Sequence, residues 1–401
     1  MASTSSARWS VGDTFEASIE KIAHGGHFIV RHEGAVFFVR HGIPGERCLM
    51  VITSTGKSFN RADVQEVLEP SPDRVSAPCT YAHRNGCGGC DFQHISIERQ
   101  RSLKAEVIAE QFARIAKIDI SVEVEEVGAS LNWRTRSTAT TNSAGKLGFY
   151  AARSHRVIPV EDCIISVSQM KMAELAARTW PSDVRVEIST SSTQERNIAL
   201  APARGEGRAR LTEGEQKLHE IIGAKTLEVS QESFWQSHTR APEVLTDAVL
   251  EFAQICNGDH VLDLYGGVGL FTAMMIDLVG SDGSIDLIEG SKVATADALR
   301  NFVNNPNVKV TVGDVAKHIV RIDCADVVVL DPPREGAGKT VVNEISRLKP
   351  RAVVYVACDP AALARDTAYF SDNGFSLVKI KAFDLFPMTH HVECVALFLP
   401  S

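Results

Sequence analysis

A cysteine and two carboxylates in the last third of the chain stand where strands are expected to end or begin. Cys358 follows the apolar run 353–357, Asp331 follows a second apolar run, and Glu393 lies near the start of the final one. A thiol at the mouth of a strand can serve as a nucleophile, although a free cysteine is most often a small core residue. We favour the nucleophile, with Glu393 as the base that later removes a proton.

Two other acids compete with Glu393 for the role of base. Asp331 and Asp359 both lie beside expected strand ends. Each also has an interpretation in which it is not the base, because an aspartate here can orient a substrate or cap the helix that we expect to start near Ala361. The residues alone leave these alternatives open.

A glycine-rich turn, 265–269, follows the first buried run of the same region. Glycines there let the backbone approach a ligand at the carboxyl end of a strand. Thr272 replaces the third glycine of the dinucleotide fingerprint, which argues against a bound pyrophosphate. Glu289 is placed to accept hydrogen bonds from ribose hydroxyls, and Asp314 could meet an adenine amino group.

From about residue 229 the pattern predicts a doubly wound parallel sheet, an α/β fold. The expected strands are 260–264, 284–288, 308–312, 327–330 and 352–357. Two further runs, 375–383 and 392–399, have no helix between them, so we expect an antiparallel hairpin at one edge. This arrangement resembles the Rossmann-like class I S-adenosylmethionine-dependent methyltransferases, and the resemblance implies S-adenosylmethionine as cofactor.

A thiol and a carboxylate beside such a cofactor suit methylation of uracil at carbon 5. This carbon is too poor a nucleophile to attack a sulfonium methyl group directly. A thiolate that adds to carbon 6 creates an enolate whose carbon 5 can accept the methyl group. A base then removes the carbon 5 proton and the thiolate leaves. In a nucleic acid the target base must also turn out of its stack.

The first 70 residues alternate short apolar and polar runs separated by glycine and proline turns. This pattern predicts about five strands closed into a small barrel, near 15–19, 27–31, 35–40, 47–53 and 59–67. Such barrels bind single-stranded nucleic acid or serve as docking modules. The segment 69–72 has two prolines and predicts a stiff linker.

The central region contains an expected helix, 96–117, and a basic stretch, 131–160, that has no Asp or Glu. Its cations and aromatic residues suit phosphate contacts and base stacking in RNA, although a basic face in open solvent is the alternative. These residues are Arg134, Arg136, Lys146, Arg153 and Arg156, with Trp133, Phe149 and Tyr150.

Three of the nine cysteines cluster, and Cys163 is a possible fourth partner for Cys79, Cys87 and Cys90. Four thiolates suit zinc or an iron–sulfur cluster, and spacing does not separate the two. We expect the cysteines without ligand-like neighbours to be core residues: Cys48, Cys256, Cys324 and Cys394.

The charge and hydropathy of the chain restrict its partners. The net charge is −8, so any nucleic-acid site must be local. No stretch has the ~18 uninterrupted apolar residues of a membrane helix, and the first ten residues lack the apolar centre of a signal peptide. We expect a cytoplasmic protein, a monomer, with no membrane partner and with reduced cysteines.

Motifs across nearly the whole chain resemble the RNA 5-methyluridine methyltransferase family, in the branch with an N-terminal TRAM domain and a four-iron four-sulfur cluster. Between the barrel and the C-terminus they occur in the family's order. They are Cys87-x2-Cys90, Gly148-Phe149-Tyr150, Asp162-Cys163, Asp331-Pro332-Pro333-Arg334, Cys358-Asp359-Pro360-Ala361 and His391-Val392-Glu393.

The resemblance implies roles for individual residues and three domains. Cys358 would be the nucleophile and Glu393 the base. The cluster would be held by Cys79, Cys87, Cys90 and Cys163, and S-adenosylmethionine would contact Gln236, Tyr265, Glu289 and Asp331, with Asp314 a weaker candidate. The expected domains are a TRAM-like OB-type barrel at 8–70, an α+β domain that binds RNA and the cluster at 71–228, and the methyltransferase domain at 229–401.

The resemblance implies methylation of uracil in large-subunit ribosomal RNA, with the T-loop uridine of tRNA as the alternative. Three departures from the family pattern stand out: seven residues separate Cys79 from Cys87 where the family usually has five, Gly266 and Gly267 replace Cys-Gly in the glycine turn, and Asp359 replaces Asn. A more distant alternative is an iron–sulfur oxidoreductase that uses NAD(P).

Overall fold

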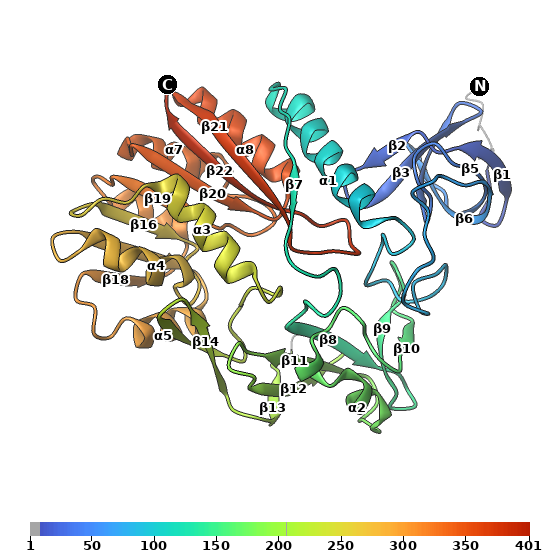
Figure 1. The fold of residues 1–401 in the computed structure, drawn as a ribbon, viewed down its shortest axis with the longest axis horizontal. Coiled ribbons are helices and arrows are strands. Elements are labelled where there is room, and N and C mark those ends of the chain that lie inside the picture. Colours follow the sequence, from blue (N-terminus) through green and yellow to red (C-terminus); the bar gives the residue numbers. More distant parts are fainter. Residues whose placement is uncertain (1–8, 206) are drawn as a thin grey trace, which may run out of the picture. The chain divides into compact units, whose positions relative to one another are not determined.

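The computed structural model describes residues 9–205 and 207–401 (Figure 1). These form two compact units. The first contains residues up to 107 together with 149–158 and 386–391. The second contains 108–148, 159–385 and 392–401.

A six-stranded sheet forms the N-terminal part of the first unit, in the order β1-β5-β6-β4-β3-β2. Its strands are β1 Thr14–Ser18, β2 Lys21–Ala23, β3 His27–His32, β4 Ala35–Arg40, β5 Arg47–Ser54 and β6 Asn60–Glu69. Alternate residues such as Phe28, Val30, Phe37 and Val39 are buried, because successive side chains of a strand point to opposite faces. The predicted five strands are present, and the short β2 adds a sixth.

Helix α1 Ile97–Gln111 begins in the first unit and continues into the π-helical turn η1 Phe112–Ala116. Lys117 then takes a left-handed backbone conformation, with φ of 60°, and ends the helix. The predicted helix 96–117 is confirmed. Its apolar residues Leu103, Val107 and Phe112 are buried.

The central part of the chain, residues 136–230, is built on antiparallel strands, and its residues 149–158 belong to the first unit. β11 pairs with β8 and with β12, and β12 pairs with β13. A separate hairpin, β14 with β15, follows. The bounds are β8 Arg136–Thr141, β9 Leu147–Tyr150, β10 Val157–Pro159, η2 Ser168–Met170, α2 Met172–Ala177, β11 Val184–Thr190, β12 Arg196–Pro202, β13 Arg210–Glu213, β14 Lys217–Ile222 and β15 Lys225–Ser230.

The C-terminal part of the second unit is an eight-stranded sheet in the order β18-β17-β16-β19-β20-β22-β21-β7. Its strands are β7 Val124–Glu126, β16 His260–Leu264, β17 Ser284–Glu289, β18 Val308–Val312, β19 Val327–Leu330, β20 Ala352–Ala357, β21 Phe375–Asp384 and β22 Glu393–Pro400. The five predicted parallel strands are confirmed. Helices cover opposite faces of the sheet, with α3 and α4 on one and α7 and α8 on the other (Figure 1).

The helices of this part are α3 Ala241–Ala253, α4 Leu270–Val279, α5 Lys292–Asn301, α6 Val315–His318, η3 Ile319–Arg321, α7 Gly338–Leu348 and α8 Pro360–Asp372. The predicted antiparallel hairpin is present as β21 and β22. Its predicted position at the sheet edge is wrong, because β7 pairs in parallel with β21. Three residues are too few for an alternating pattern to reveal such a strand.

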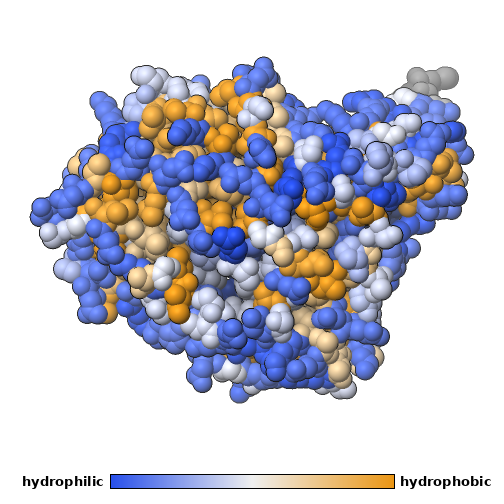
Figure 2. Space-filling view, in the orientation of Figure 1, coloured by the Kyte–Doolittle hydropathy of each residue, from blue (hydrophilic) through white to orange (hydrophobic). Residues whose placement is uncertain are grey.

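The surface is mixed in character. In the view of Figure 2, polar residues cover most of the face and hydrophobic residues show between them. Among the described residues, no helix has both the length and the apolar character needed to cross a membrane.

Candidate active site

A cavity of about 450 Å³ lies at the carboxyl ends of the parallel strands. Tyr265 and Asp314 line it, as do Gly290 and Gly313, which follow β17 and β18, and the residues that begin α7. Small-molecule sites of this size are typical of the crevice beyond the strand ends of an open α/β sheet. Two of the five residues predicted to contact the cofactor therefore meet in one cavity.

The glycine turn beside this cavity is held by two acids. Asp263 Oδ2 accepts hydrogen bonds from the backbone N–H of Thr272 at 3.1 Å and from its hydroxyl at 2.6 Å. Glu289 Oε2 accepts one from the N–H of Gly267 at 3.0 Å. Thr272 thus does not merely replace a glycine, since its side chain binds the buried aspartate. Glu289 keeps its carboxylate at the turn, where we predicted contacts to ribose.

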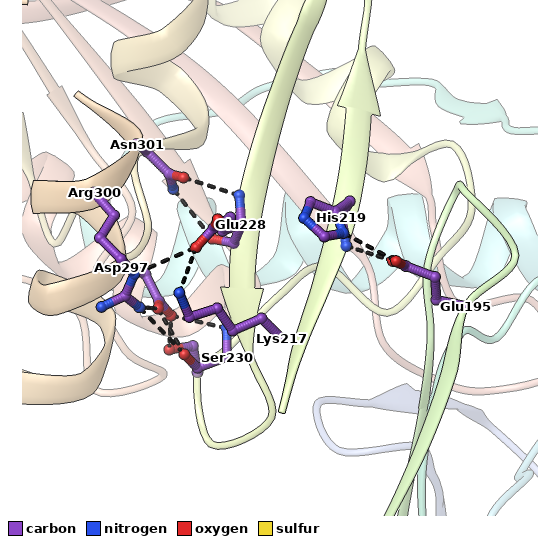
Figure 3. A network of polar contacts seen from close by, with 9 residues as sticks. Glu195, Lys217, His219, Glu228, Ser230, Asp297, Arg300 and Asn301 are labelled. Carbon is purple, nitrogen blue, oxygen red and sulfur yellow. Dashed lines mark hydrogen bonds and ion pairs between the residues drawn. The ribbon is translucent and has the colours of Figure 1, made fainter. Parts of the chain in front are cut away.

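Helix α5 binds the segment that precedes Gln236 through a polar network around Asp297, Ser230 and Arg300 (Figure 3). Asp297 is fully buried, and its carboxylate accepts hydrogen bonds from the Ser230 N–H at 2.9 Å and from the hydroxyls of Ser230 and Ser233 at 2.6 and 2.5 Å. Arg300 of the same helix pairs with Asp297. Segment 230–233, three residues before the buried Gln236, is therefore anchored to α5.

Asn301, at the end of α5, joins strand β15 to the glycine turn. Its side-chain NH₂ donates to the carbonyl oxygens of Glu228 and Val268, at 3.1 and 3.0 Å. Its carbonyl oxygen accepts from the Glu228 N–H at 2.8 Å (Figure 3). Asp297 and Asn301 were not found from the sequence, because polar residues within a helix carry no signal of a distant backbone partner.

The predicted nucleophile and base lie at the end of two paired strands. β20 and β22 are antiparallel, and their last recorded pair is Ala357 with Cys394. Cys358 and Glu393 are the chain neighbours of this last pair, Cys358 directly after Ala357 and Glu393 directly before Cys394. They are close enough for the Glu393 charge to raise the pKa of the Cys358 thiol. The structure therefore brings these two predicted residues together.

Burial and mutual repulsion dominate the electrostatics of this pair. Burial, followed by the negative charges of Glu393 and Asp331, raises the pKa of the Cys358 thiol to about 12. Burial and the Asp331 charge likewise raise the pKa of Glu393 well above its usual value of 4.5. Arg334 opposes both shifts. Resting Cys358 is thus a thiol, and Glu393, 4% exposed, favours its neutral form.

Asp331 and Asp359 have different environments. Burial and the charges of Asp263 and Glu289 raise the pKa of Asp331, so this residue connects the cofactor turn electrostatically with the Cys358–Glu393 pair. Asp359 instead caps α8, because its Oδ1 accepts the backbone N–H groups of Ala361 and Ala362, both at 2.9 Å. The capping interpretation of Asp359 is confirmed.

A second buried acid holds the loop that contains Arg334. Asp366 Oδ2 accepts hydrogen bonds from the Tyr355 hydroxyl at 2.7 Å and from the N–H groups of Ala337 and Gly338 at 2.8 and 3.2 Å. Ala337 and Gly338 also line the cofactor cavity. One carboxylate thus fixes the segment that runs from Arg334 to the cavity wall. No pattern in the sequence distinguishes Asp366 from other helical acids.

The four predicted thiolate ligands do not form a metal site in this structure. Cys79, Cys87 and Cys90 belong to the first unit and Cys163 to the second, and all four are half-buried without a disulfide. Within residues 9–205 and 207–401, no three His, Cys, Asp or Glu side chains are grouped to hold a metal ion. The iron–sulfur cluster and the zinc alternative remain predictions, and no chemistry below passes through them.

The basic stretch is only partly available to a partner. Trp133 is 2% exposed and stacks on His238, with ring centroids 5.6 Å apart, so its predicted role as a stacking plane for RNA is wrong. Burial lowers the pKa of Arg136 to about 10, and its guanidinium donates to Ser189. Lys146, Arg153 and Arg156 are exposed, and Phe149 and Tyr150 are half-buried.

The prediction that four cysteines are core residues is wrong for two of them. Cys48 and Cys394 are buried in strands, as expected, but Cys256 and Cys324 are exposed. Both exposed cysteines lie in loops, after α3 and before β19, where the backbone leaves the core.

The fold is shared with a solved methyltransferase. The crystal structure of Pyrococcus abyssi tRNA (uracil-54, C5)-methyltransferase in complex with S-adenosyl-L-homocysteine matches with a TM-score of 0.74 and 20% identity, over 96% of this chain and 99% of that one. The sheet order, the glycine turn and the cavity at the strand ends define a class I S-adenosylmethionine-dependent methyltransferase. The Tyr265 ring and the Asp314 carboxylate, both in the cavity lining, suit the adenine and polar groups of that cofactor.

Sequence relatives give the family. An uncharacterized RNA methyltransferase of Streptomyces avermitilis is 40% identical and covers 98% of this chain and 99% of its own. An uncharacterized RNA methyltransferase of Streptomyces coelicolor is 39% identical, and the match covers 98% of this chain and 94% of the relative. The family model for tRNA (Uracil-5-)-methyltransferase matches residues 215–400. The chain belongs to the RNA (uracil-5-)-methyltransferase family, which removes the nicotinamide-dependent oxidoreductase from consideration.

Replacing Asn301 with Ala should weaken cofactor binding. The variant loses three hydrogen bonds to backbone groups, each worth about 0.5–1.5 kcal/mol, and frees the glycine turn from segment 228–230. We expect the Kd of S-adenosylhomocysteine, measured by isothermal titration calorimetry, to rise about tenfold. Asn343→Ala, at an exposed position on α7, is the control. An unchanged Kd in folded Asn301→Ala would show that α5 does not organise the cavity.

Replacing Glu393 with Gln should stabilise the protein in a pH-dependent way. A pKa raised in the folded state means that the folded protein keeps a proton which the unfolded chain has lost above its usual value of 4.5. The contribution of Glu393 to stability therefore falls as pH rises, by about 1.4 kcal/mol per unit of pKa difference over the full window.

We expect Glu393→Gln to unfold at a higher urea concentration than wild type at about pH 8, with the difference shrinking towards about pH 5. Glu335→Gln, at an exposed position, should show no such trend. A gain that is equal at both pH values would contradict the buried, proton-retaining Glu393.

Proposed function

We propose that this methyltransferase modifies carbon 5 of uracil in RNA through a covalent adduct on Cys358, with Glu393 as the base. The observation that carries the proposal is that Cys358 and Glu393 adjoin the last recorded pair of β20 and β22, Ala357 with Cys394, and that the Glu393 charge acts on the thiol. Their shared surroundings support it further, because both have raised pKa values and both are influenced by Asp331 and Arg334.

The chemistry follows the order in which these groups can act. Cys358 loses its proton to solvent and its sulfur bonds to carbon 6 of the uracil, which moves the ring's double-bond electrons onto the carbon 4 oxygen. S-adenosylmethionine would supply the methyl group that carbon 5 then accepts, and would leave as S-adenosylhomocysteine. Glu393, ionised after giving its own proton to solvent, takes the proton from carbon 5, the double bond re-forms, and the bond between sulfur and carbon 6 breaks. The electrons and the proton balance without a redox partner.

The raised pKa values of Cys358 and Glu393 indicate a role for Arg334. A thiol with a pKa of about 12 forms thiolate rarely at neutral pH, so any nearby cation increases the reactive fraction. Arg334 is the cation that lowers the pKa of both Cys358 and Glu393. A neutral Glu393 would also remove one of the negative charges that hold the thiol protonated.

Large-subunit ribosomal RNA is the proposed substrate. Its support is the resemblance of the N-terminal six-stranded sheet and the Cys-rich segment to the TRAM branch of the family. The T-loop uridine of tRNA is the second candidate, favoured by the wording of the matched family model and by the tRNA substrate of the structural neighbour. The RNA contacts proposed are those of the exposed cations of the basic stretch.

Two single substitutions test the proposed chemistry. Cys358→Ala should abolish formation of 5-methyluridine, because no adduct can form. Glu393→Gln should instead accumulate a covalent protein–RNA complex with ordinary uridine RNA and cofactor, visible on a denaturing gel. Unchanged methylation by Cys358→Ala would refute the adduct, and normal turnover by Glu393→Gln would remove it from the role of base.

The substrate is found by mass spectrometry of nucleosides from a deletion strain. We expect large-subunit ribosomal RNA, purified and digested separately from tRNA, to lose 5-methyluridine, and the loss to be restored by wild-type protein but not by Cys358→Ala. Loss from tRNA alone would replace the proposed substrate with the T-loop uridine. Loss from neither would contradict both candidates.

A further inference from the structure

The loop between the last two strands belongs to the first unit, although its flanking strands belong to the second. Residues 386–391 connect β21, which ends at Asp384, to β22, which begins at Glu393. Only Val392 separates this loop from the proposed base. Whatever fixes the loop therefore also constrains the backbone that carries the Glu393 carboxylate.

Two buried side chains of α1 bind the backbone of this loop. Gln100 Oε1 accepts the N–H of Met388 at 2.9 Å, and Gln100 Nε2 donates to the carbonyl oxygens of Phe92 and Ile95 at 3.1 and 2.9 Å. Lys104 Nζ donates to the Phe386 carbonyl oxygen at 3.1 Å. Gln100 and Lys104 are 0% and 1% exposed.

The residues that follow the Cys-rich turn bind the same loop from another side. The N–H of Phe92 donates to the Met388 carbonyl oxygen at 3.0 Å. Asp91 accepts a hydrogen bond from His390 Nδ1 at 2.6 Å and also pairs with Arg40 of β4. Two segments of the first unit, α1 and residues 91–92, thus hold a loop about 290 residues further along the chain, and Arg40 supports the second of them.

Burying polar side chains to hold a loop is unfavourable unless all their hydrogen bonds are made. Such buried contacts therefore indicate a loop whose position matters. An amide and an ammonium group buried without partners would each cost several kcal/mol, and ordinary connecting loops are held at the surface without such groups. Here the amide of Gln100 is satisfied on both its oxygen and its nitrogen, and both backbone groups of Met388 are bonded. The loop therefore has one well-defined conformation next to the base.

We propose that Gln100 and Lys104 are positioning residues for Glu393, acting through loop 386–391. The inference rests on the proposed role of Glu393 as the base. Neither side chain takes part in bond formation. They hold the loop so that the carboxylate meets the proton on carbon 5, and they connect the N-terminal unit to one step of the reaction.

This role predicts a defect confined to the last step. Glu393 acts only after sulfur addition and methyl transfer, so a displaced carboxylate slows proton removal and leaves the earlier steps intact. A shift of about 1 Å in a reacting group can cost about 100-fold in rate. General loss of folding would instead slow every step together.

Gln100→Met tests the inference, because methionine keeps the length of the side chain and removes the amide. We expect turnover on uridine RNA to fall about 10–100-fold. RNA with 5-fluorouridine, which has no proton to release from carbon 5, reports the earlier steps alone. With it the rate of adduct formation should stay close to wild type. Ordinary uridine RNA should leave a covalent complex that wild type does not accumulate, and Lys104→Met should behave in the same way.

Gln111→Met is the matched control, since Gln111 is 2% exposed on the same helix and lies outside the first unit. It should turn over normally. Unchanged turnover in Gln100→Met, or parallel losses of turnover and of 5-fluorouridine adduct formation, would overturn the positioning role. A wild-type enzyme that makes no 5-methyluridine would refute the proposed function itself, which separates the two failures.

Discussion

Burial of acidic groups beside the Cys358 thiol at one edge of a sheet, followed by repulsion among their charges, is the constraint on which this active site depends. Asp331 stands between the acids of the cofactor turn and the pair formed by Cys358 and Glu393, and it raises the pKa of both members of that pair. Placing a second carboxylate beside a nucleophile suppresses the thiolate. The same placement keeps a carboxyl group where the carbon 5 proton must be removed. The arrangement therefore lowers the reactivity of the resting Cys358 thiol and provides the base for the final step.

Buried carboxylates in the second unit fall into two groups with different consequences. Asp297 and Asp366 each accept several hydrogen bonds from hydroxyl and backbone N–H groups, and they fix segments of chain. Glu393 is different, because burial and the Asp331 charge raise its pKa well above its usual value. The carboxylates that accept several hydrogen bonds fix the chain segments around the site. A strongly raised pKa in a carboxyl group is the pattern expected of functional acids.

The sequence predicted the elements whose signal is local. The parallel strands are short runs of buried residues, so their positions were recognisable, and Asp359 was recognisable as a helix cap. Burial of an individual side chain was harder: Trp133 beside two arginines suggested a surface for stacking, but His238, about a hundred residues away, covers it. Strand β7 escaped notice because it has three residues. The anchors from Gln100, Asn301 and Asp366 depend on backbone groups far along the chain and leave no periodicity.

The central claim is that the sulfur of Cys358 bonds to the uracil ring, and peptide mapping tests it most directly. Protein incubated with cofactor and 5-fluorouridine RNA is digested with nuclease and trypsin, and the modified peptide is sequenced by tandem mass spectrometry. The account predicts a methylated fluorouridine nucleotide attached to the peptide that contains Cys358, and to no other cysteine. A nucleotide attached elsewhere, or no attached nucleotide while ordinary uridine RNA is still methylated, would contradict it.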